Sequence, residues 1–298
     1  MFDITPTLDC AGRPLKLDRP RILGIVNVTP DSFSDGGAYD STQAAIEHGL
    51  KLVEAGADAL DIGGESTRPG ADAVPLETEL ARVLPVIEGL ARATQVPISI
   101  DTFKPEVMRA AVAAGAGLIN DICALTRDGA LEAAAELGVP VILMHMQGEP
   151  RTMQDAPQYD DVVGQVRRFL ADRLFACELA GIPKSRLVID PGFGFGKNLD
   201  HNLHLLARLE AFADLGVPLL AGLSRKRMLG EITEREVGER AAASVAAHLI
   251  AAQRGAMLLR VHDVAPLRDA LALWQALQPH LPTPARNAPA MPRWPDEE

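Results

Sequence analysis

The stretch MLLRVHDV, residues 257–264, ends an apolar run with two groups that can carry positive charge. Alternate side chains of a β-strand face the same way, so Arg260 and His262 would share one face at the end of a strand. Two such groups together favour a bound anion. The structural alternative is a salt bridge from Arg260 to a strand-end carboxylate, either Asp263 or Asp190, but we expect Arg260 to have no such partner.

Polar residues also end, or directly follow, the other seven apolar runs of the chain. They are Asn27, Asp61, Asp101, Asn120 with Asp121, His145, Asp190 and Ser224. Burial of so many polar groups is costly unless each finds a partner, so we expect a functional site where the run ends meet. Asp61 could instead accept hydrogen bonds from loop amides, and His145 could support a neighbouring residue. Asn120 and Asp121 must face opposite ways, and their spacing alone does not say which one faces the site.

The residue types at these positions suit two kinds of ligand. Lys226, in GLSRKRM, would join the two cations of MLLRVHDV in a phosphate or diphosphate clamp, because barrel phosphate sites often follow the seventh and eighth strands. Asn27 could give a neutral oxygen to Mg²⁺, an ion that takes few protein ligands. Asp101 and Asp190 would accept hydrogen bonds from a flat nitrogen heterocycle with several N–H donors.

Three polar loops follow the runs that carry these residues. NVTPDSFSDGG (27–37) and GGESTRPGA (63–71) have the composition of mobile active-site lids. DPGFGFGKN (190–198) surrounds two phenylalanines with glycines, which would let the backbone approach a ligand closely or would simply form tight turns.

From residue 21 onward, short apolar runs alternate with segments of helical period. The expected strands are 21–28, 58–64, 97–101, 117–122, 140–145, 186–190, 218–223 and 257–262, and the expected helices lie near 41–55, 77–93, 105–114, 128–137, 160–180, 200–212, 238–254 and 264–278. Eight such units in about 260 residues predict an α/β fold of the (β/α)₈ or TIM-barrel type. A doubly wound sheet is the alternative, but it would need a glycine-rich turn after its first strand.

The two ends of the chain differ from this pattern. Residues 1–20, with the turn CAGRP, predict a short N-terminal β-hairpin that closes the barrel bottom. Residues 279–298 contain six prolines and predict a disordered C-terminal tail. We therefore expect one barrel domain over residues 1–278, followed by this tail.

Composition excludes several classes of protein. The formal net charge of −11 and the absence of a basic run argue against nucleic-acid binding. The three cysteines form no Cys-x-x-Cys pair, so neither a disulfide framework nor a zinc site is indicated. No signal-peptide pattern and no apolar run of about 18 residues is present. We expect a cytoplasmic protein that acts on small molecules, with neither nucleic acid nor membrane as a partner.

Seven strings, in their order and spacing, resemble the dihydropteroate synthase family of the bacterial folate pathway. They are GIVNVTPDSFSDGG, DIGGESTRPGA, LINDI, LMHMQG, DPGFGFGKN, GLSRKRMLG and LRVHDV, and the resemblance extends from residue 21 to about residue 278. It implies a pterin-binding TIM barrel that joins 6-hydroxymethyl-7,8-dihydropterin diphosphate to 4-aminobenzoate, releasing diphosphate and 7,8-dihydropteroate. It also implies a homodimer, a requirement for Mg²⁺ and inhibition by sulfonamides.

The resemblance assigns roles residue by residue. Pterin diphosphate would be bound by Thr67, Asp101, Asn120, Asp190, Lys226, Arg260 and His262, 4-aminobenzoate by Phe33, Thr67, Arg68, Pro69, Phe195 and Ser224, and the metal by Asn27. Asp101, Lys226 and Arg260 would also serve catalysis. Lys197 is a further cation near the site whose role stays open.

Two other functions remain as alternatives. A pterin-binding methyltransferase would share the barrel and its carboxylates but would need neither a diphosphate clamp nor the Ser-Thr-Arg-Pro loop. A catalytically silent pterin-binding paralogue would be expected to have lost Asn27, Arg68, Lys226 or Arg260, all of which are present. The chemistry that the resemblance implies begins with departure of diphosphate, which leaves a carbocation-like methylene, and the aniline nitrogen then attacks that carbon. No nucleophilic Ser or Cys is needed, and the sequence shows no Ser-His-Asp or Cys-His constellation that would supply one.

Overall fold

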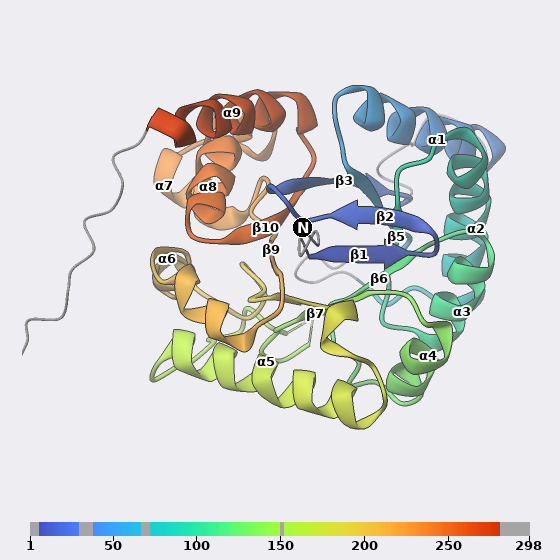
Figure 1. Cartoon of the computed structure of the whole chain (residues 1–298), viewed down its shortest axis with the longest axis horizontal. Helices are drawn as coiled ribbons and strands as arrows, with labels where there is room; N and C mark the ends of the chain where they lie inside the picture. Colours follow the sequence, from blue (N-terminus) through green and yellow to red (C-terminus); the bar gives the residue numbers. More distant parts are fainter. Residues whose placement is uncertain (1–5, 30–37, 67–71, 150–151, 281–298) are drawn as a thin grey trace, which may run out of the picture.

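A closed barrel of eight parallel strands forms the centre of the computed structural model, which describes residues 6–29, 38–66, 72–149 and 152–280 (Figure 1). The strands are β3 (Arg21–Asn27), β4 (Ala59–Gly63), β5 (Ile98–Asp101), β6 (Leu118–Asp121), β7 (Val141–Met144), β8 (Leu187–Asp190), β9 (Leu219–Ala221) and β10 (Ala256–Val261). Each strand pairs in parallel with the next, and β10 pairs with β3 to close the ring. The predicted (β/α)₈ barrel is confirmed, and a doubly wound sheet is excluded.

Helices surround the barrel on its outside (Figure 1). They are α1 (Ala38–Glu54), α2 (Leu76–Ala93), α3 (Pro105–Ala113), α4 (Ala130–Leu137), α5 (Val162–Leu179), α6 (Leu199–Ala207), α7 (Arg227–Thr233), α8 (Ala241–Gln253) and α9 (Val264–Leu277), with short 3₁₀ helices η2 (Lys184–Arg186), η3 (Leu209–Leu215), η4 (Val237–Glu239) and η5 (Gln278–His280). None of the helices in the described ranges is both long and apolar enough to cross a membrane.

Several helical elements differ from the predictions, among them the helix expected over 238–254, whose first residues form η4 before α8 begins at Ala241. The short helix α7 was not predicted, because it buries only Met228 and Leu229 and so shows no helical period in the sequence. The helix expected over 200–212 is divided at Arg208, where the backbone leaves helical geometry and η3 begins. Of the tail expected over 279–298, the first two residues belong to η5, and residues 281–298 lie outside the described ranges.

Alternation along the strands divides the apolar core into two layers. Residues such as Ile22, Leu60 and Ile98 lie in the larger layer, between the strands and the helices. Their neighbours Leu23 and Ala59 lie in a second cluster inside the barrel. Because both faces of each strand are buried, the strands read in the sequence as nearly continuous apolar runs.

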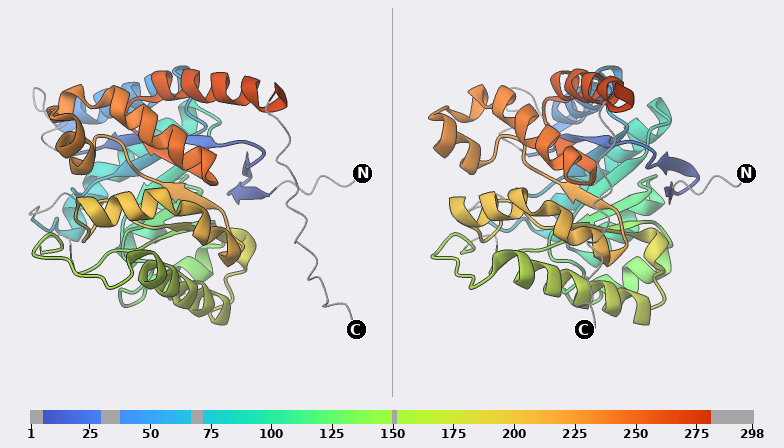
Figure 2. Two further views of the ribbon diagram at one scale, coloured as in Figure 1. Left: turned by 90° about the vertical axis from the view of Figure 1, so that its left-hand side faces the viewer. Right: turned by 60° about the vertical axis from the view of Figure 1, so that its left-hand side comes forward.

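An antiparallel hairpin fills the N-terminal end of the barrel. Its strands β1 (Thr7–Cys10) and β2 (Arg13–Lys16) are joined by Ala11 and Gly12, which both have positive φ, as a type I′ turn requires. Leu8 and Leu15 of the hairpin belong to the inner cluster. Figure 2 shows the hairpin standing at one end of the barrel. The predicted closure of the barrel bottom is confirmed, and the opposite end is left for the site.

Candidate active site

Arg260 is the centre of an ion network at the C-terminal end of the barrel. Its Nε lies 2.5 Å from Asp61 Oδ2, and its Nη2 lies 2.7 Å from Asp101 Oδ2. The expectation of an arginine without a carboxylate partner is therefore wrong. The side chain reaches from β10 across to β4 and β5, whereas Asp263, one of the partners considered, pairs with Arg225.

The other hydrogen bonds of this network show which strand-end residues face the barrel interior. Asn120 Nδ2 donates to Asp61 Oδ2 over 3.0 Å, so Asn120 points inward. Its neighbour Asp121 instead accepts hydrogen bonds from the backbone N–H groups of Cys123 and Leu125. Asp61 is fully buried, and it accepts hydrogen bonds from the side chains of Asn120 and Arg260, whereas donation by loop amides was the alternative considered.

Lys226 and Asp190 line another side of the same mouth. Lys226 immediately precedes α7, and its Nζ lies 4.1 Å from the centre of the Phe195 ring in a cation–π contact. Asp190 ends β8 and accepts a hydrogen bond of 2.7 Å from the N–H of Gly192. The end of β8 and the loop that follows it therefore bring an anion and an aromatic ring to the mouth.

Burial controls the electrostatics of these groups. Removal from water raises the pKa of Asp101 to about 7, although the positive charge of Arg260 opposes this change. Burial likewise raises the pKa of Asp190 to about 6. For Lys226, burial and then the charge of Arg260 lower the pKa to about 8. All three groups thus titrate within about one or two pH units of neutrality, a property that is common at functional sites.

Ser224 and His262 lie side by side at the barrel mouth. The Ser224 hydroxyl accepts a hydrogen bond of 3.1 Å from the His262 backbone N–H and lies 3.0 Å from His262 Nδ1. The sequence analysis placed these two residues in different subsites, one for 4-aminobenzoate and one for diphosphate. Their contact means that the two predicted subsites adjoin.

His145 and Lys197, whose roles were left open, contact each other. Lys197 Nζ lies 3.0 Å from His145 Nδ1, and both side chains are buried. Burial, and secondly the charge of Lys197, lower the pKa of His145 to about 2, so the imidazole is neutral. The remaining contacts of Lys197 are with carbonyl groups of the β8–α6 loop and of His145, so both residues support this loop.

Asn27 offers an oxygen donor of the kind that a magnesium ion binds. A methyl group added at Gly63 would lie 3.8 Å from Asn27 Oδ1 and 3.7 Å from Asp101 Oδ2, which places both oxygens near the same point of the mouth. Oxygen donors suit Mg²⁺, which keeps much of its shell as water and substrate phosphate. Within the described ranges, no group of three or more His, Cys, Asp or Glu residues could hold a metal. The Asn27 oxygen and the lack of such a group in these ranges both agree with a magnesium site that has few protein ligands.

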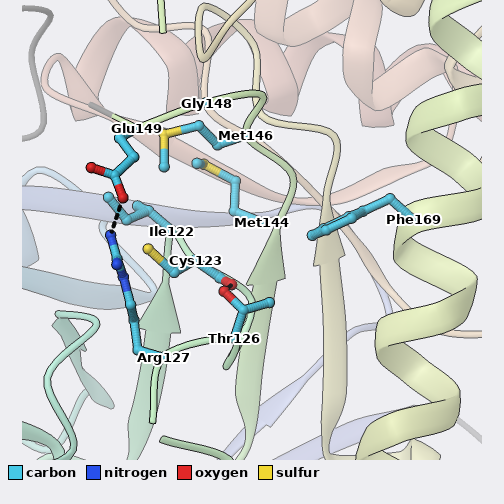
Figure 3. A pocket seen from close by; sticks show the side chains of 9 residues that line it. All are labelled: Ile122, Cys123, Thr126, Arg127, Met144, Met146, Gly148, Glu149 and Phe169. Atoms are coloured by element: carbon cyan, nitrogen blue, oxygen red, sulfur yellow. Dashed lines mark hydrogen bonds and ion pairs between the residues drawn. The ribbon is translucent and has the colours of Figure 1, made fainter. Parts of the chain in front are cut away.

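A cavity of about 220 Å³ borders this mouth beside β6 and β7 (Figure 3). Ile122 and Met144, which line it, also form a small apolar cluster with Phe195. Arg127 and Glu149 pair across one side of the cavity, as the dashed line in Figure 3 shows. These apolar residues could not be predicted as part of a cavity, because in the sequence pattern they are indistinguishable from core residues.

An ion cluster that the sequence pattern did not indicate lies beside the mouth. Lys104 Nζ lies 2.5 Å from both Glu65 Oε2 and Glu79 Oε2, and Glu65 Oε1 accepts a hydrogen bond from the N–H of Val74. Lys104 thus ties the connection between β4 and α2 to the start of α3. The one signal in the sequence was the spacing of Glu79, which places it on the same apolar face of α2 as Val83. In the structure Glu79 is fully buried.

Four predicted site residues, Phe33, Thr67, Arg68 and Pro69, lie outside the described residues. The others, Asn27, Asp101, Asn120, Asp190, Phe195, Ser224, Lys226, Arg260 and His262, lie at or just beyond the C-terminal ends of the strands. Their individual roles toward ligands stay predictions.

The closed barrel, with polar and charged side chains gathered at the C-terminal ends of its strands, has the architecture of a (β/α)₈-barrel enzyme. A family model described as pterin binding enzyme matches residues 23–262. The Escherichia coli (strain K12) dihydropteroate synthase is 52% identical over 265 residues, which are 89% of this chain and 94% of that protein.

Solved structures give the same result. The Xanthomonas albilineans dihydropteroate synthase with 4-aminobenzoic acid is 66% identical, with a TM-score of 0.89 over 93% of this chain and 100% of that one. The same species' enzyme in complex with 7,8-dihydropteroate is 62% identical, with a TM-score of 0.85 over the same shares of the two chains. The chain belongs to the pterin-binding enzymes and, among them, to the dihydropteroate synthase family. The predicted family, fold and transferase activity are confirmed.

Proposed function

We propose that this barrel mouth joins 6-hydroxymethyl-7,8-dihydropterin diphosphate to 4-aminobenzoate, with the roles that the sequence analysis assigned. The observation that supports this proposal most strongly is the pair of ion contacts from Arg260 to Asp61 and Asp101. They lie at the end of the barrel where Lys226 also lies. It combines an anion-binding cation with carboxylates that can accept N–H groups, as a pterin that carries a diphosphate requires.

The pterin ring would lie among Asp101, Asn120 and Asp190. Their carboxylate and amide groups can accept the ring N–H donors and, through Asn120, donate to a ring acceptor. Support comes from the inward position of Asn120 and from the burial of all three side chains. Buried polar groups of this kind discriminate strongly, because a wrong ligand would leave them unpaired.

Arg260 and His262 would stabilise the charge that develops on the departing diphosphate, and Lys226 would reach the carbonyl edge of the pterin. The bond between the pterin methylene carbon and the diphosphate oxygen breaks, the aniline nitrogen of aminobenzoate forms a bond to that carbon, and the nitrogen loses one proton. Asp101, close to the ring, would stabilise the positive charge that spreads from the methylene into the pterin. No protein nucleophile is required.

Aminobenzoate would contact Phe195, whose ring lies beside Lys226, and Ser224, which lies beside His262. The resemblance adds Phe33, Thr67, Arg68 and Pro69, for which the described residues give no further support. Thr67 would also contact the pterin diphosphate.

Mg²⁺, when bound through Asn27, would neutralise part of the diphosphate charge. We expect the Asn27→Ala variant to weaken the binding of pterin diphosphate about tenfold or more and to leave that of aminobenzoate unchanged, because a hydrogen bond or ligand to a charged group contributes roughly 1.5–3 kcal/mol. Calorimetric titration of Mg²⁺ with inorganic diphosphate gives a readout that does not depend on turnover. An equal loss of both substrate affinities would contradict this role.

The homodimer and the cytoplasmic location are further proposals that rest on the family resemblance. Sedimentation equilibrium of the purified chain would test the dimer.

One assay tests the proposed function itself. Pterin diphosphate and 4-aminobenzoate are mixed with the chain and Mg²⁺, and released diphosphate is measured together with 7,8-dihydropteroate. Formation of both products in equal amounts is expected. Pterin binding without product would favour a silent paralogue, and methyl transfer from a methylated pterin would favour the methyltransferase alternative.

A further inference from the structure

Lys197 occupies the centre of the β8–α6 loop, residues 191–198, with only 2% of its surface exposed. Its Nζ lies 2.9 Å from the carbonyl oxygens of Gly192 and Phe195, 3.3 Å from the carbonyl oxygen of His145 and 3.0 Å from His145 Nδ1. An ammonium group has three N–H donors, so these four neutral acceptors can use all of them. The lysine therefore acts as a hub for the loop backbone.

Packing alone does not explain a lysine at this position. A buried ammonium group is costly, and burial lowers its pKa to about 7, with the nearby charge of Lys226 acting in the same direction and that of Asp190 against it. A methionine of similar length would fill the volume without this cost. The difference between the two side chains lies in the N–H donors.

The backbone that Lys197 holds follows a path that few residues allow. Gly192 and Gly196 have positive φ values of 70° and 61°, and a Cβ atom at either would collide with the carbonyl group of His145 or Gln147. The loop thus lies directly on the backbone beyond β7. In this position its carbonyl groups turn toward Lys197 and need a donor.

The same loop fixes two groups of the proposed site. The Gly192 N–H donates to Asp190 Oδ1, and the Phe195 ring lies 4.1 Å from Lys226 Nζ. Lys197 binds the carbonyl groups of these two loop residues, Gly192 and Phe195. A change at Lys197 would therefore move both the partner of Asp190 and the ring that contacts Lys226.

We propose that Lys197 is a positioning residue for the pterin side of the site, holding Asp190 and Phe195 in register with Lys226 through three backbone carbonyl groups. This inference rests on the proposed function, because it assumes that Asp190 and Lys226 contact the pterin. It separates the pterin half of the mouth, which depends on the loop after β8, from the diphosphate half, which depends on Asn27, Arg260 and His262.

The test compares two probes on the full chain. Calorimetry measures the Kd of 6-hydroxymethylpterin without diphosphate, and separately the Kd of inorganic diphosphate with Mg²⁺. In the Lys197→Met variant we expect the pterin Kd to rise about tenfold or more, as for the loss of a hydrogen bond to a charged group, and the diphosphate Kd to stay within about twofold. Tyr159→Phe is the matched control, because it removes a 2.9 Å hydrogen bond to Gly196 of the same loop without touching the Lys197 hub. This control should leave both Kd values unchanged.

The outcomes are distinct. Unchanged pterin affinity in Lys197→Met, or parallel losses for both probes, would overturn the proposal, the second because it indicates a general structural defect. If Lys197→Met does not fold, Lys197→Gln, which has a shorter stem and two neutral donors, is measured in the same way and must show the same selective loss. If the unaltered chain binds no pterin, the proposed function fails instead.

Discussion

Arg260 can hold two carboxylates and still bind an anion. Its guanidinium group has five N–H donors, of which the contacts with Asp61 and Asp101 use two. The remaining donors can face a phosphate group, and the carboxylates hold the planar group in a fixed orientation for it. The ion pairs with the protein are therefore compatible with the diphosphate role that the sequence predicts.

The Arg260→Met variant should lose both ligand affinity and stability. The pterin diphosphate Kd should rise ten- to a hundredfold or more, since a charge-assisted hydrogen bond contributes roughly 1.5–3 kcal/mol. The free energy of unfolding should fall by roughly 3 kcal/mol or more, because Asp61 is fully buried and would lose its cation. Calorimetry and thermal unfolding of the same preparation measure the two effects.

Arg225→Met is the control for this experiment. It breaks the ion pair with Asp263, in which the two side chains are 35% and 23% exposed. Partly exposed pairs contribute about 1 kcal/mol or less, so this variant should unfold at nearly the original temperature. A stable Arg260→Met variant would mean that the pairs with Asp61 and Asp101 do not form in solution.

Pterin affinity should depend on pH with a maximum between about pH 7 and pH 8. Asp101 and Asp190 must be ionised to accept ring N–H groups, and burial raises their pKa values to about 7 and about 6. Lys226, with a pKa lowered first by burial to about 8, loses its charge above that value. Calorimetry with a diphosphate-free pterin from pH 5 to pH 9 measures the profile, and an affinity that is constant below pH 7 would contradict it.

The free energy of unfolding of the unliganded chain should fall as the pH rises toward about 7, whereas pterin affinity should rise over the same range. Asp101 binds its proton more tightly in the folded chain than at its ordinary pKa of 3.8. Its contribution to the free energy of unfolding is therefore fully present below that pH and is lost as the pH rises through about 7. The same sign holds for Asp190, over a window that ends near pH 6.

Sequence reasoning at this scale identified residue types but not partners. Alternation left Asn120 and Asp121 equivalent, and only the contacts with Asp61 and with the Cys123 amide distinguish them. The partners of Arg260 lie 199 and 159 residues away along the chain, so no local pattern could indicate them. From the sequence, Lys197 could be described only as an extra cation. Its contacts include three backbone carbonyl groups, which leave no signature in the sequence.

At the scale of single elements, Lys104 connects the start of α3 with α2 and with the connection that follows β4. Removal of its charge in Lys104→Met should lower the free energy of unfolding by roughly 3 kcal/mol, because Glu79 has no exposed surface and would lose its cation. Arg109→Met provides a matched control on the same helix, since the Arg109–Glu136 pair is exposed and should contribute about 1 kcal/mol or less. Urea unfolding measures both, and equal midpoints for the two variants would contradict the prediction.

The elements themselves were predictable where burial imposes a period. Every barrel strand begins and ends within two residues of its expected ends, because each strand coincides with an apolar run between two helical segments. α7 was not predicted, because a seven-residue helix with two buried side chains shows no helical period of apolar residues. The ion cluster of Glu65, Lys104 and Glu79 was not predicted for a different reason, because its charged residues come from three separate segments of the chain.

At the scale of the whole molecule, the barrel keeps the packing of the N-terminal hairpin apart from the ligand site. The hairpin and the inner cluster fill the N-terminal end, and the polar network occupies the C-terminal end. The hairpin packs in the inner cluster at one end, whereas Arg260 pairs with Asp61 and Asp101 at the other. Changes at the hairpin should therefore alter folding without altering the affinity for ligands.

Leu15→Ala tests this separation. Leu15 is 4% exposed and packs in the inner cluster with Leu23 and Leu118, so its truncation leaves a cavity. The free energy of unfolding should fall by roughly 2–5 kcal/mol, as for other buried leucines. The Kd of pterin diphosphate should stay within about twofold, because the strands that carry Asp101 and Arg260 keep their pairing at the other end. Thermal unfolding and calorimetry at a temperature well below the midpoint measure both quantities. A large loss of affinity in the folded variant would show that the hairpin end and the mouth are coupled through the barrel, and the two functions of the strands could then not be separated.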